Sequence, residues 1–312
     1  MNRGLDNNIW TPEVSQHGGH MIMENVKKPS KIKYVNIDSR FQEEYNSNKG
    51  AAFSFQLPQK LNEVKSIAVR SIEIPMTFYY FSAKRGNTSC RVTYINEGIP
   101  ASSNIIIPDG NYTVNGLQDA LNGRFRAILG GENKLTVNTG VNVFTINNVL
   151  DNDNPNFTIH WDVDMNGNFQ KTNFKSSLGW CLGFRQPEYT IAPIANKNYI
   201  TSEGVVDIYN TRYLFLVVDE FRQSNPNSFI SPLPSSLISK NILARITLNP
   251  AIYSYGTILT ANTFNGLLLS DQRLYAGKTD IQKLNIQLVD EWGNVVDLNG
   301  VDFSFCLEIE HE

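Results

Sequence analysis

Short runs in which apolar and polar residues alternate fill most of this chain, and they constrain its fold more than any other feature. Phe53, Phe55 and Leu57 alternate with polar residues, and a similar run ends at Pro75. Successive side chains of a strand point to opposite faces, so such runs predict strands with one buried face. The expected strands cover residues 31–38, 51–57, 64–74, 90–95, 104–108, 135–137, 142–146, 157–164, 189–194, 205–209, 213–219, 241–248, 281–290 and 303–310. This pattern predicts an all-β fold, a jelly-roll-type β-sandwich.

One amphipathic helix interrupts the strands, near residues 113–129. Thr113 is suited to cap its first turn, and Gly130 and Gly131 are suited to end it. We expect the helix to be inserted in the sandwich and to cover it with a single apolar stripe. That stripe consists of Val114, Leu117, Leu121, Phe125 and Ile128.

Length and composition indicate a globular protein with a sizeable core. The chain has 312 residues, of which 41% are hydrophobic and 18% are charged. No linker divides residues 31–312, which we expect to form one sandwich domain. The net charge of −3 argues against a surface that neutralises phosphates, so direct nucleic-acid binding is not expected. No secretory segment and no apolar run long enough to span a membrane is visible, which predicts a cytosolic protein.

Residues 1–30 lack the periodicity of the rest and are expected to form an extended N-terminal arm. The segment is rich in Asn, Gly and His and cannot build a core of its own. A few apolar residues within it are candidates for contact with a neighbouring subunit, the alternative being a frayed terminus. These candidate interface residues are Ile9, Trp10, Met21, Ile22 and Met23.

Two patterns resemble metal sites but lack the necessary ligands. Asp162, Asp164 and Asn166 begin a calcium-loop pattern, yet Asn173 stands where a bidentate glutamate is required. A hairpin turn is the better interpretation. His17 and His20 have no further ligands near them in the sequence. We therefore expect no metal site and no cofactor.

Residues suited to catalysis are few. His160 lies in an expected strand, and His311 is the penultimate residue. The acidic pairs Asp219-Glu220 and Asp290-Glu291 lie at strand ends, where paired carboxylates of glycosidases also occur. Solvated charge at turns is the simpler interpretation, and we expect no enzymatic activity. The three cysteines, Cys90, Cys181 and Cys306, lie in apolar runs and are expected to be small buried residues.

The order of several motifs resembles the minor capsid and penton proteins of nucleocytoplasmic large DNA viruses. The first motif is Tyr34-Val-Asn-Ile-Asp-Ser-Arg40, followed by Phe53-Ser-Phe-Gln-Leu-Pro58. The second runs from Val64 to Pro75 and continues into the aromatic run Phe78-Tyr-Tyr-Phe81. The third is Ile107-Pro-Asp-Gly-Asn-Tyr-Thr113, with the helix, the hairpins and Leu182-Gly-Phe184 after it.

The resemblance implies a β-sandwich subunit of an icosahedral capsid, assembled in the host cytoplasm and located in the virion of a giant virus. Its implied partners are the major capsid protein and other minor capsid proteins, together with copies of itself. A penton subunit at the vertex would form a pentamer, whereas a minor capsid protein would cement the major-capsid trimers. The arm would then reach under or between neighbours. Both roles stay open, with the single sandwich and leading arm favouring the penton.

A binding module is the competing hypothesis. A virion-surface or fibre β-sandwich that recognises glycan or a receptor would use long loops such as residues 224–234. Tyr253 and Tyr255 are the aromatic candidates for such a surface.

Overall fold

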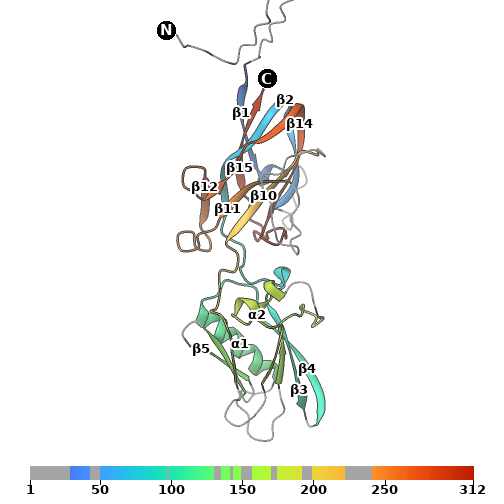
Figure 1. Cartoon of the computed structure of the whole chain (residues 1–312), viewed down its shortest axis with the longest axis vertical. Helices are drawn as coiled ribbons and strands as arrows, with labels where there is room; N and C mark the ends of the chain where they lie inside the picture. The colour runs from blue at the N-terminus through green and yellow to red at the C-terminus, as the bar shows by residue number, and fades with distance from the viewer. Residues whose placement is uncertain are drawn as a thin grey trace, which may run out of the picture.

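The computed structural model describes residues 29–42, 50–96, 98–129, 135–140, 143–148, 157–169, 174–191, 199–221 and 241–312. These residues form two lobes stacked along the long axis of the molecule (Figure 1). The large lobe contains both the first and the last strand. The second lobe is built from the chain between β2 and β10 and is therefore an insertion in the large one.

The large lobe is a curled antiparallel sheet of eight strands, which confirms the predicted jelly-roll-type β-sandwich. Its strand order is β1-β15-β2-β14-β10-β11-β13, and β12 pairs with β2. The strands are β1 (Lys31–Asp38), β2 (Ala52–Pro75), β10 (Tyr213–Asp219), β11 (Ile242–Thr247), β12 (Ile258–Asn262), β13 (Leu268–Leu269), β14 (Arg273–Val289) and β15 (Ser304–His311).

Strand β2 holds this sheet together because it pairs with three others. Its first half pairs with β14, as in Phe53 opposite Ile286, and its second half pairs with β15, as in Ile72 opposite Phe305. The last residues of β2 also pair with β12. The sequence predicted two strands, 51–57 and 64–74, where the structure has one of 24 residues. Glu63, with φ of 53°, lies between the halves, where the pairing with β14 shifts register.

The second lobe contains two small antiparallel sheets and both α-helices. One sheet has the order β4-β3-β7-β8 and the other the order β5-β6-β9. Its strands are β3 (Ser89–Asn96), β4 (Ile99–Ile106), β5 (Leu135–Thr139), β6 (Phe144–Asn148), β7 (Phe157–His160), β8 (Glu188–Ile191) and β9 (Tyr199–Thr201). The helices are α1 (Val114–Leu129) and α2 (Leu178–Cys181), with the short 3-10 helix η4 (Phe174–Ser176) before α2. A 3-10 helix η3 (Ala83–Arg85) lies on the link between β2 and β3, and another, η1 (Ser39–Phe41), follows β1 in the large lobe.

Helix α1 forms where the sequence predicted it, but it packs elsewhere. The Gly116 N–H donates to the Thr113 hydroxyl at 3.0 Å, which confirms Thr113 as the cap. Leu117, Leu121 and Phe125 are buried as expected, whereas Ile128 is 39% exposed and Leu129 takes its place. The helix contacts β5 and β4, so the prediction that its stripe covers the large sandwich is wrong.

Two other local predictions have different outcomes. The predicted hairpin forms as β5 and β6, with Thr139 opposite Phe144. The strand predicted for residues 205–209 is wrong, because Ile208 and Tyr209 form a turn in the link back to β10. The Tyr209 N–H donates to the Asp207 carboxylate at 3.2 Å, which stabilises this turn.

Buried apolar side chains of the two lobes form one continuous cluster. In the second lobe Trp161 stacks on Phe184 with ring centroids 5.0 Å apart.

A single domain over residues 31–312, preceded by an arm, stays a prediction. No helix in the described ranges is long and apolar enough to cross a membrane.

Candidate functional site: the cleft between the two lobes

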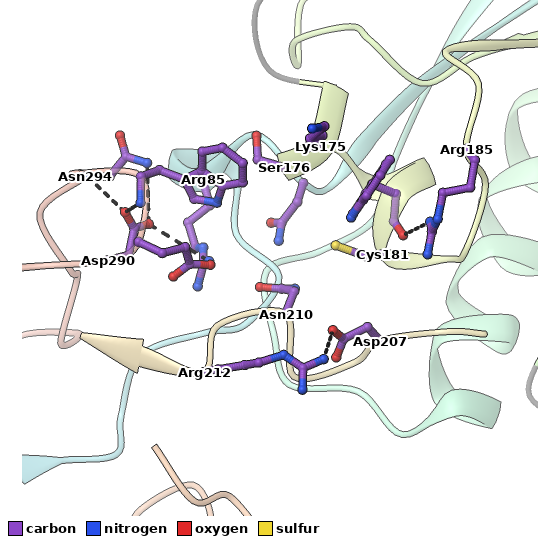
Figure 2. Close-up of a pocket in the computed structure, with 14 residues that line it drawn as sticks. Arg85, Lys175, Ser176, Cys181, Arg185, Asp207, Asn210, Arg212, Asp290 and Asn294 are labelled. Carbon is purple, nitrogen blue, oxygen red and sulfur yellow. Dashed lines mark hydrogen bonds and ion pairs between the residues drawn. The ribbon is translucent and has the colours of Figure 1, made fainter. Parts of the chain in front are cut away.

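A cavity of about 390 Å³ lies where the two lobes meet (Figure 2). The chain passes between the lobes twice, once between β2 and β3 and once between β9 and β10. Both links contribute to the cavity wall, as do the α2 region and the turn after β14. Residues that are far apart in the sequence therefore converge on one space.

The α2 side of the cleft is basic. Lys175 is exposed, and within the described ranges it has no hydrogen-bond or ion-pair partner. The Arg185 guanidinium lies over the Trp180 ring, 4.2 Å from its centroid, and donates to the backbone carbonyl of Trp180 at 3.0 Å. Arg212, on the link back to β10, forms an ion pair of 2.8 Å with Asp207.

The opposite side of the cleft is the acidic turn after β14. Asp290 is buried, and its carboxylate accepts the N–H groups of Trp292 and Asn294, each at 2.9 Å. These two hydrogen bonds to Asp290 stabilise the turn 290–294. Glu291 lies beside it with its side chain 13% exposed.

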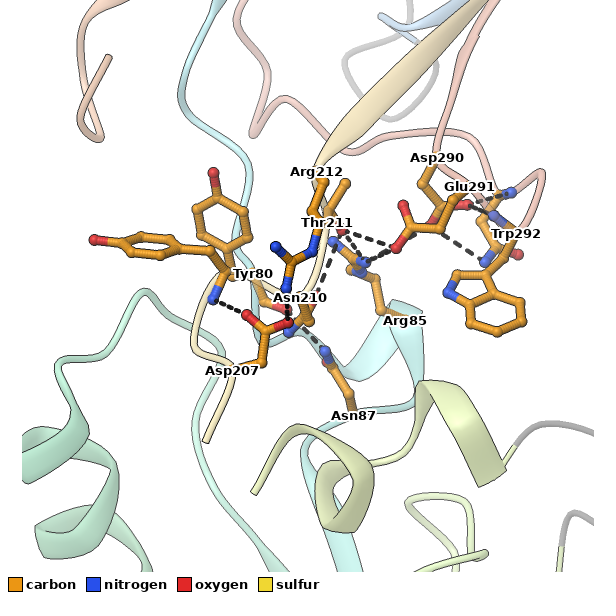
Figure 3. A network of polar contacts seen from close by, with 12 residues as sticks. Tyr80, Arg85, Asn87, Asp207, Asn210, Thr211, Arg212, Asp290, Glu291 and Trp292 are labelled. Atoms are coloured by element: carbon orange, nitrogen blue, oxygen red, sulfur yellow. Dashed lines mark hydrogen bonds and ion pairs between the residues drawn. The ribbon is translucent and has the colours of Figure 1, made fainter. Parts of the chain in front are cut away.

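Arg85 connects the two sides (Figure 3). Its guanidinium donates to the Thr211 hydroxyl and lies 3.7 Å from Glu291 Oε1 and 3.9 Å from Asp290 Oδ2. The Thr211 hydroxyl in turn lies 3.4 Å from Glu291 Oε1. Arg85 comes from the first link between the lobes, Thr211 from the second, and the two carboxylates from the large lobe. This network therefore joins all three segments.

Glu291 is electrostatically unusual. Burial raises its pKa to about 7, although the Arg85 guanidinium acts in the opposite direction. Its Oε2 atom is buried and has no hydrogen-bond partner. A carboxyl group in this environment changes its charge near neutral pH.

Side-chain amides hold the two links together at the same place. The Asn87 amide donates to the Tyr80 carbonyl at 2.8 Å, and the Asn210 amide donates to the same carbonyl at 3.1 Å. The Ser82 N–H donates to the Asn87 side-chain oxygen at 2.8 Å. These hydrogen bonds therefore hold the two links between the lobes against each other.

The acidic pairs are not the solvated charge that the sequence suggested. Glu220 is buried with Arg273, and their side chains are 1% and 2% exposed. The Arg273 guanidinium donates to Glu220 at 2.8 Å and to the Val218 carbonyl at 2.8 Å, and the Tyr275 hydroxyl donates to Glu220 at 2.5 Å. Asp290 and Glu291 belong to the cleft. The two pairs therefore lie in separate structural networks.

The calcium-loop pattern is a turn, as predicted. The Asp164 carboxylate accepts the N–H groups of Asn166 and Asn168, each at 2.8 Å, and Gly167 has φ of 79°. Val163 forms a bridge with Phe169 across this turn. Across the described ranges, no three His, Cys, Asp or Glu side chains gather in a way that could hold a metal.

The remaining candidates lie apart from the cleft, with one exception. His160 is in β7, where Thr93 and Glu188 contact its ring, and His311 is the last residue of β15. Cys90 and Cys181 are buried, as predicted, and Cys306 is half-buried. Cys181 lines the cavity, but burial raises the pKa of its thiol to about 12, which keeps it protonated.

The predicted interface residues of the arm, Ile9, Trp10, Met21, Ile22 and Met23, lie outside the described residues. The sequence singled out three of the cleft residues, Cys181, Asp290 and Glu291, but it did not indicate that they share one site. The lining residues are scattered between residues 85 and 294, and no local pattern connects them.

The chain is similar in structure to a solved protein but matches no known sequence family. No family model matches the chain, and no curated protein matches it. The crystal structure of the mavirus penton protein is similar with a TM-score of 0.45 and 12% sequence identity. The match covers 90% of this chain and all of that one.

Proposed function

We propose that this chain is a structural component of an icosahedral virus capsid, either a penton subunit at the vertex or a minor capsid protein. The ordered motifs between Tyr34 and Phe184 support this proposal, as does the jelly-roll-type sandwich that they predicted. In this role the protein performs no catalysis. It contributes shape and contact surfaces to a shell in the virion of a giant virus, assembled in the host cytoplasm.

The observation that carries the proposal is the open edge of the large sheet. Strand β1 lies at the end of the strand order, and among the described residues it pairs only with β15. Ile32 and Tyr34 on this strand are 57% and 65% exposed. Edge strands with exposed apolar side chains are sites of pairing with other chains. The predicted arm directly precedes this edge, so the two together would form one contact region.

The partners follow from this geometry. We propose that β1 and the arm contact neighbouring copies of this chain, the major capsid protein or other minor capsid proteins. A penton subunit would close into a pentamer through such heterologous contacts. Ile9, Trp10, Met21, Ile22 and Met23 are the arm residues proposed to reach the neighbour.

Solution mass tests the proposal. We expect the purified chain to form pentamers, or to co-purify with the major capsid protein when the two are expressed together. Replacing both Ile32 and Tyr34 with serine should weaken either association while leaving the melting temperature nearly unchanged, because both side chains are exposed. A strict monomer that binds neither itself nor the capsid protein would contradict the proposal.

A glycan-binding module is a second candidate, supported by one exposed aromatic pair. Tyr79 and Tyr255 stack with ring centroids 5.8 Å apart, and Tyr255 is 52% exposed beside the exposed Ile252. Tyr253 packs against the core instead. A glycan array separates the candidates, since sugar binding that is lost in Tyr255→Ala would favour the module.

A further inference from the structure

We propose that the cleft between the lobes binds a small phosphorylated anion, through Lys175, Arg185 and Arg212. This proposal does not depend on the capsid role, because it rests on the cavity and its charges alone. The cavity of about 390 Å³ is within the usual size range of small-ligand sites and too small for a folded partner.

The cationic side chains of the cleft are only partly neutralised. Among the described residues Lys175 has no carboxylate partner. The side-chain contacts of Arg185 are with the neutral carbonyls of Trp180 and Phe184, each at 3.0 Å. Asp207 forms its ion pair with Arg212 and not with Lys175 or Arg185. An incoming anion would therefore meet positive charge that the fold has not already paired.

One further carboxylate, that of Glu203, lies near this group. Glu203 accepts the backbone N–H of Arg185 at 3.1 Å and the hydroxyl of Tyr189 at 2.6 Å. These two donors occupy its oxygens, and Glu203 does not line the cavity. It lowers the positive potential near Arg185 without blocking the space in front of it.

The acids on the opposite wall do not cancel this charge. Asp290 accepts N–H groups of its own turn, and Glu291 faces Arg85 and Thr211. Figure 2 shows Lys175 and Arg185 on the α2 side of the cleft and Asp290 with Asn294 on the other. The basic wall therefore presents Lys175 and Arg185 to an anion, with Arg212 beside them in its ion pair with Asp207, while the acidic wall holds its own turn.

The chemistry of the wall favours phosphate over a simple carboxylate. Arginine and lysine side chains that converge on one space match the several oxygens of a phosphate group. Trp180 and Trp292 also line the cavity and add aromatic surface suited to a planar ring. An inorganic polyphosphate and a nucleotide share the phosphate chain that these side chains would bind. Only the nucleotide also carries a planar ring.

Calorimetric titration of the full chain with sodium tripolyphosphate, and separately with ATP, tests the proposal at low ionic strength. We expect one site per chain for both ligands. Equal affinities would assign the site to the phosphate chain, and tighter binding of ATP would assign it to a nucleotide. Lys175→Ala should weaken binding about tenfold, the loss of one charge-assisted hydrogen bond, and Lys175→Glu should weaken it further.

The matched control is Lys31→Ala, because Lys31 is also exposed but lies at the start of β1. It should bind both ligands as the wild type does. Among the described residues Lys175 has no hydrogen-bond or ion-pair partner to lose, so an unchanged melting temperature would show that its variants remain folded. The proposal is overturned if neither ligand binds the wild type, or if Lys175→Glu binds as tightly as the wild type.

Discussion

At the scale of single residues, the carboxylates are the groups whose environment departs most from the sequence-based expectation. Asp219 and Asp290 each precede a glutamate at the end of a strand, a position typical of solvated charge. In the folded chain, Glu220 and Glu291 are instead placed against arginines that are distant in the sequence. Glu220 pairs with a residue 53 positions away, which no local pattern could indicate.

Glu291 should make the stability of the protein depend on pH. Its pKa in the folded state, about 7, is raised above its ordinary value of 4.5. The folded state therefore holds its proton more tightly, so the free energy of unfolding should fall as pH rises from about 4.5 to about 7. The fall should be about 2 to 3 kcal/mol, and Glu291→Gln should remove it.

Chemical denaturation at pH 5 and pH 8 measures this effect. The matched control is Asp271→Asn, which neutralises an exposed carboxylate and should leave the wild-type pH dependence in place. If Glu291→Gln and the wild type lose the same stability between the two pH values, the burial of Glu291 does not control its protonation.

The buried pair of Glu220 and Arg273 should be costly to break. Glu220→Ala leaves a guanidinium that is 2% exposed without its carboxylate, and such a loss costs about 3 to 5 kcal/mol. Lys60→Ala is the comparison, because Lys60 pairs with Asp280 at 2.8 Å while both side chains are about half exposed. That variant should lose less than about 1 kcal/mol. Equal losses in urea denaturation would contradict this account of Glu220.

At the scale of elements, the sequence predicted local structure well and pairing poorly. The α1 cap at Thr113 and the hairpin of β5 and β6 follow from contacts within a few residues. The continuity of β2 could not be predicted, because the exposed residues near Glu63 resemble a turn. The inserted lobe was missed for a related reason: which sheet a strand joins depends on partners such as β1 and β15, from opposite ends of the chain.

The stripe of α1 gives a prediction at this scale. Leu121→Ala removes a fully buried side chain and should cost about 2 to 5 kcal/mol. Ile128→Ala should cost much less, because Ile128 is 39% exposed. Thermal denaturation of both variants compares them, and a greater loss in Ile128→Ala would mean that the helix packs through a different face.

Two glycines give a second prediction at the scale of elements. Gly183, which follows α2, has φ of 97°, and a Cβ atom there would lie 2.1 Å from the Gly204 carbonyl oxygen. Gly183→Ala should therefore destabilise the fold by at least about 2 kcal/mol. Gly123 in α1 has open space around it, so Gly123→Ala should stabilise the protein by about 0.5 to 1 kcal/mol. Similar melting temperatures for the two variants would contradict this assignment.

At the scale of the whole molecule, the large lobe carries its edge strand β1 beside the last strand, β15 (Figure 1). The inserted lobe lies at the other end of the long axis, joined through the cleft. A capsid role would use the two lobes differently. The sheet edge and the arm would contact neighbours, and the inserted lobe would lie farther from those contacts.

Removal of the arm tests this division. Deleting residues 1–30 should leave the melting temperature within a few degrees of the wild type, because β1 begins only at Lys31. Incorporation into particles should fall strongly. Trp10→Ala combined with Ile22→Ala should reproduce part of that loss without shortening the chain. Full incorporation of the deletion variant would contradict the proposed role of the arm in assembly.

The most direct test of the capsid role is density of the intact particle with this chain placed in it. We expect the two-lobed chain to lie either at the five-fold vertices or beneath the major-capsid trimers, with β1 at a subunit boundary. Purified particles that contain no copy of the chain, or a chain placed with β1 facing solvent on all sides, would contradict it.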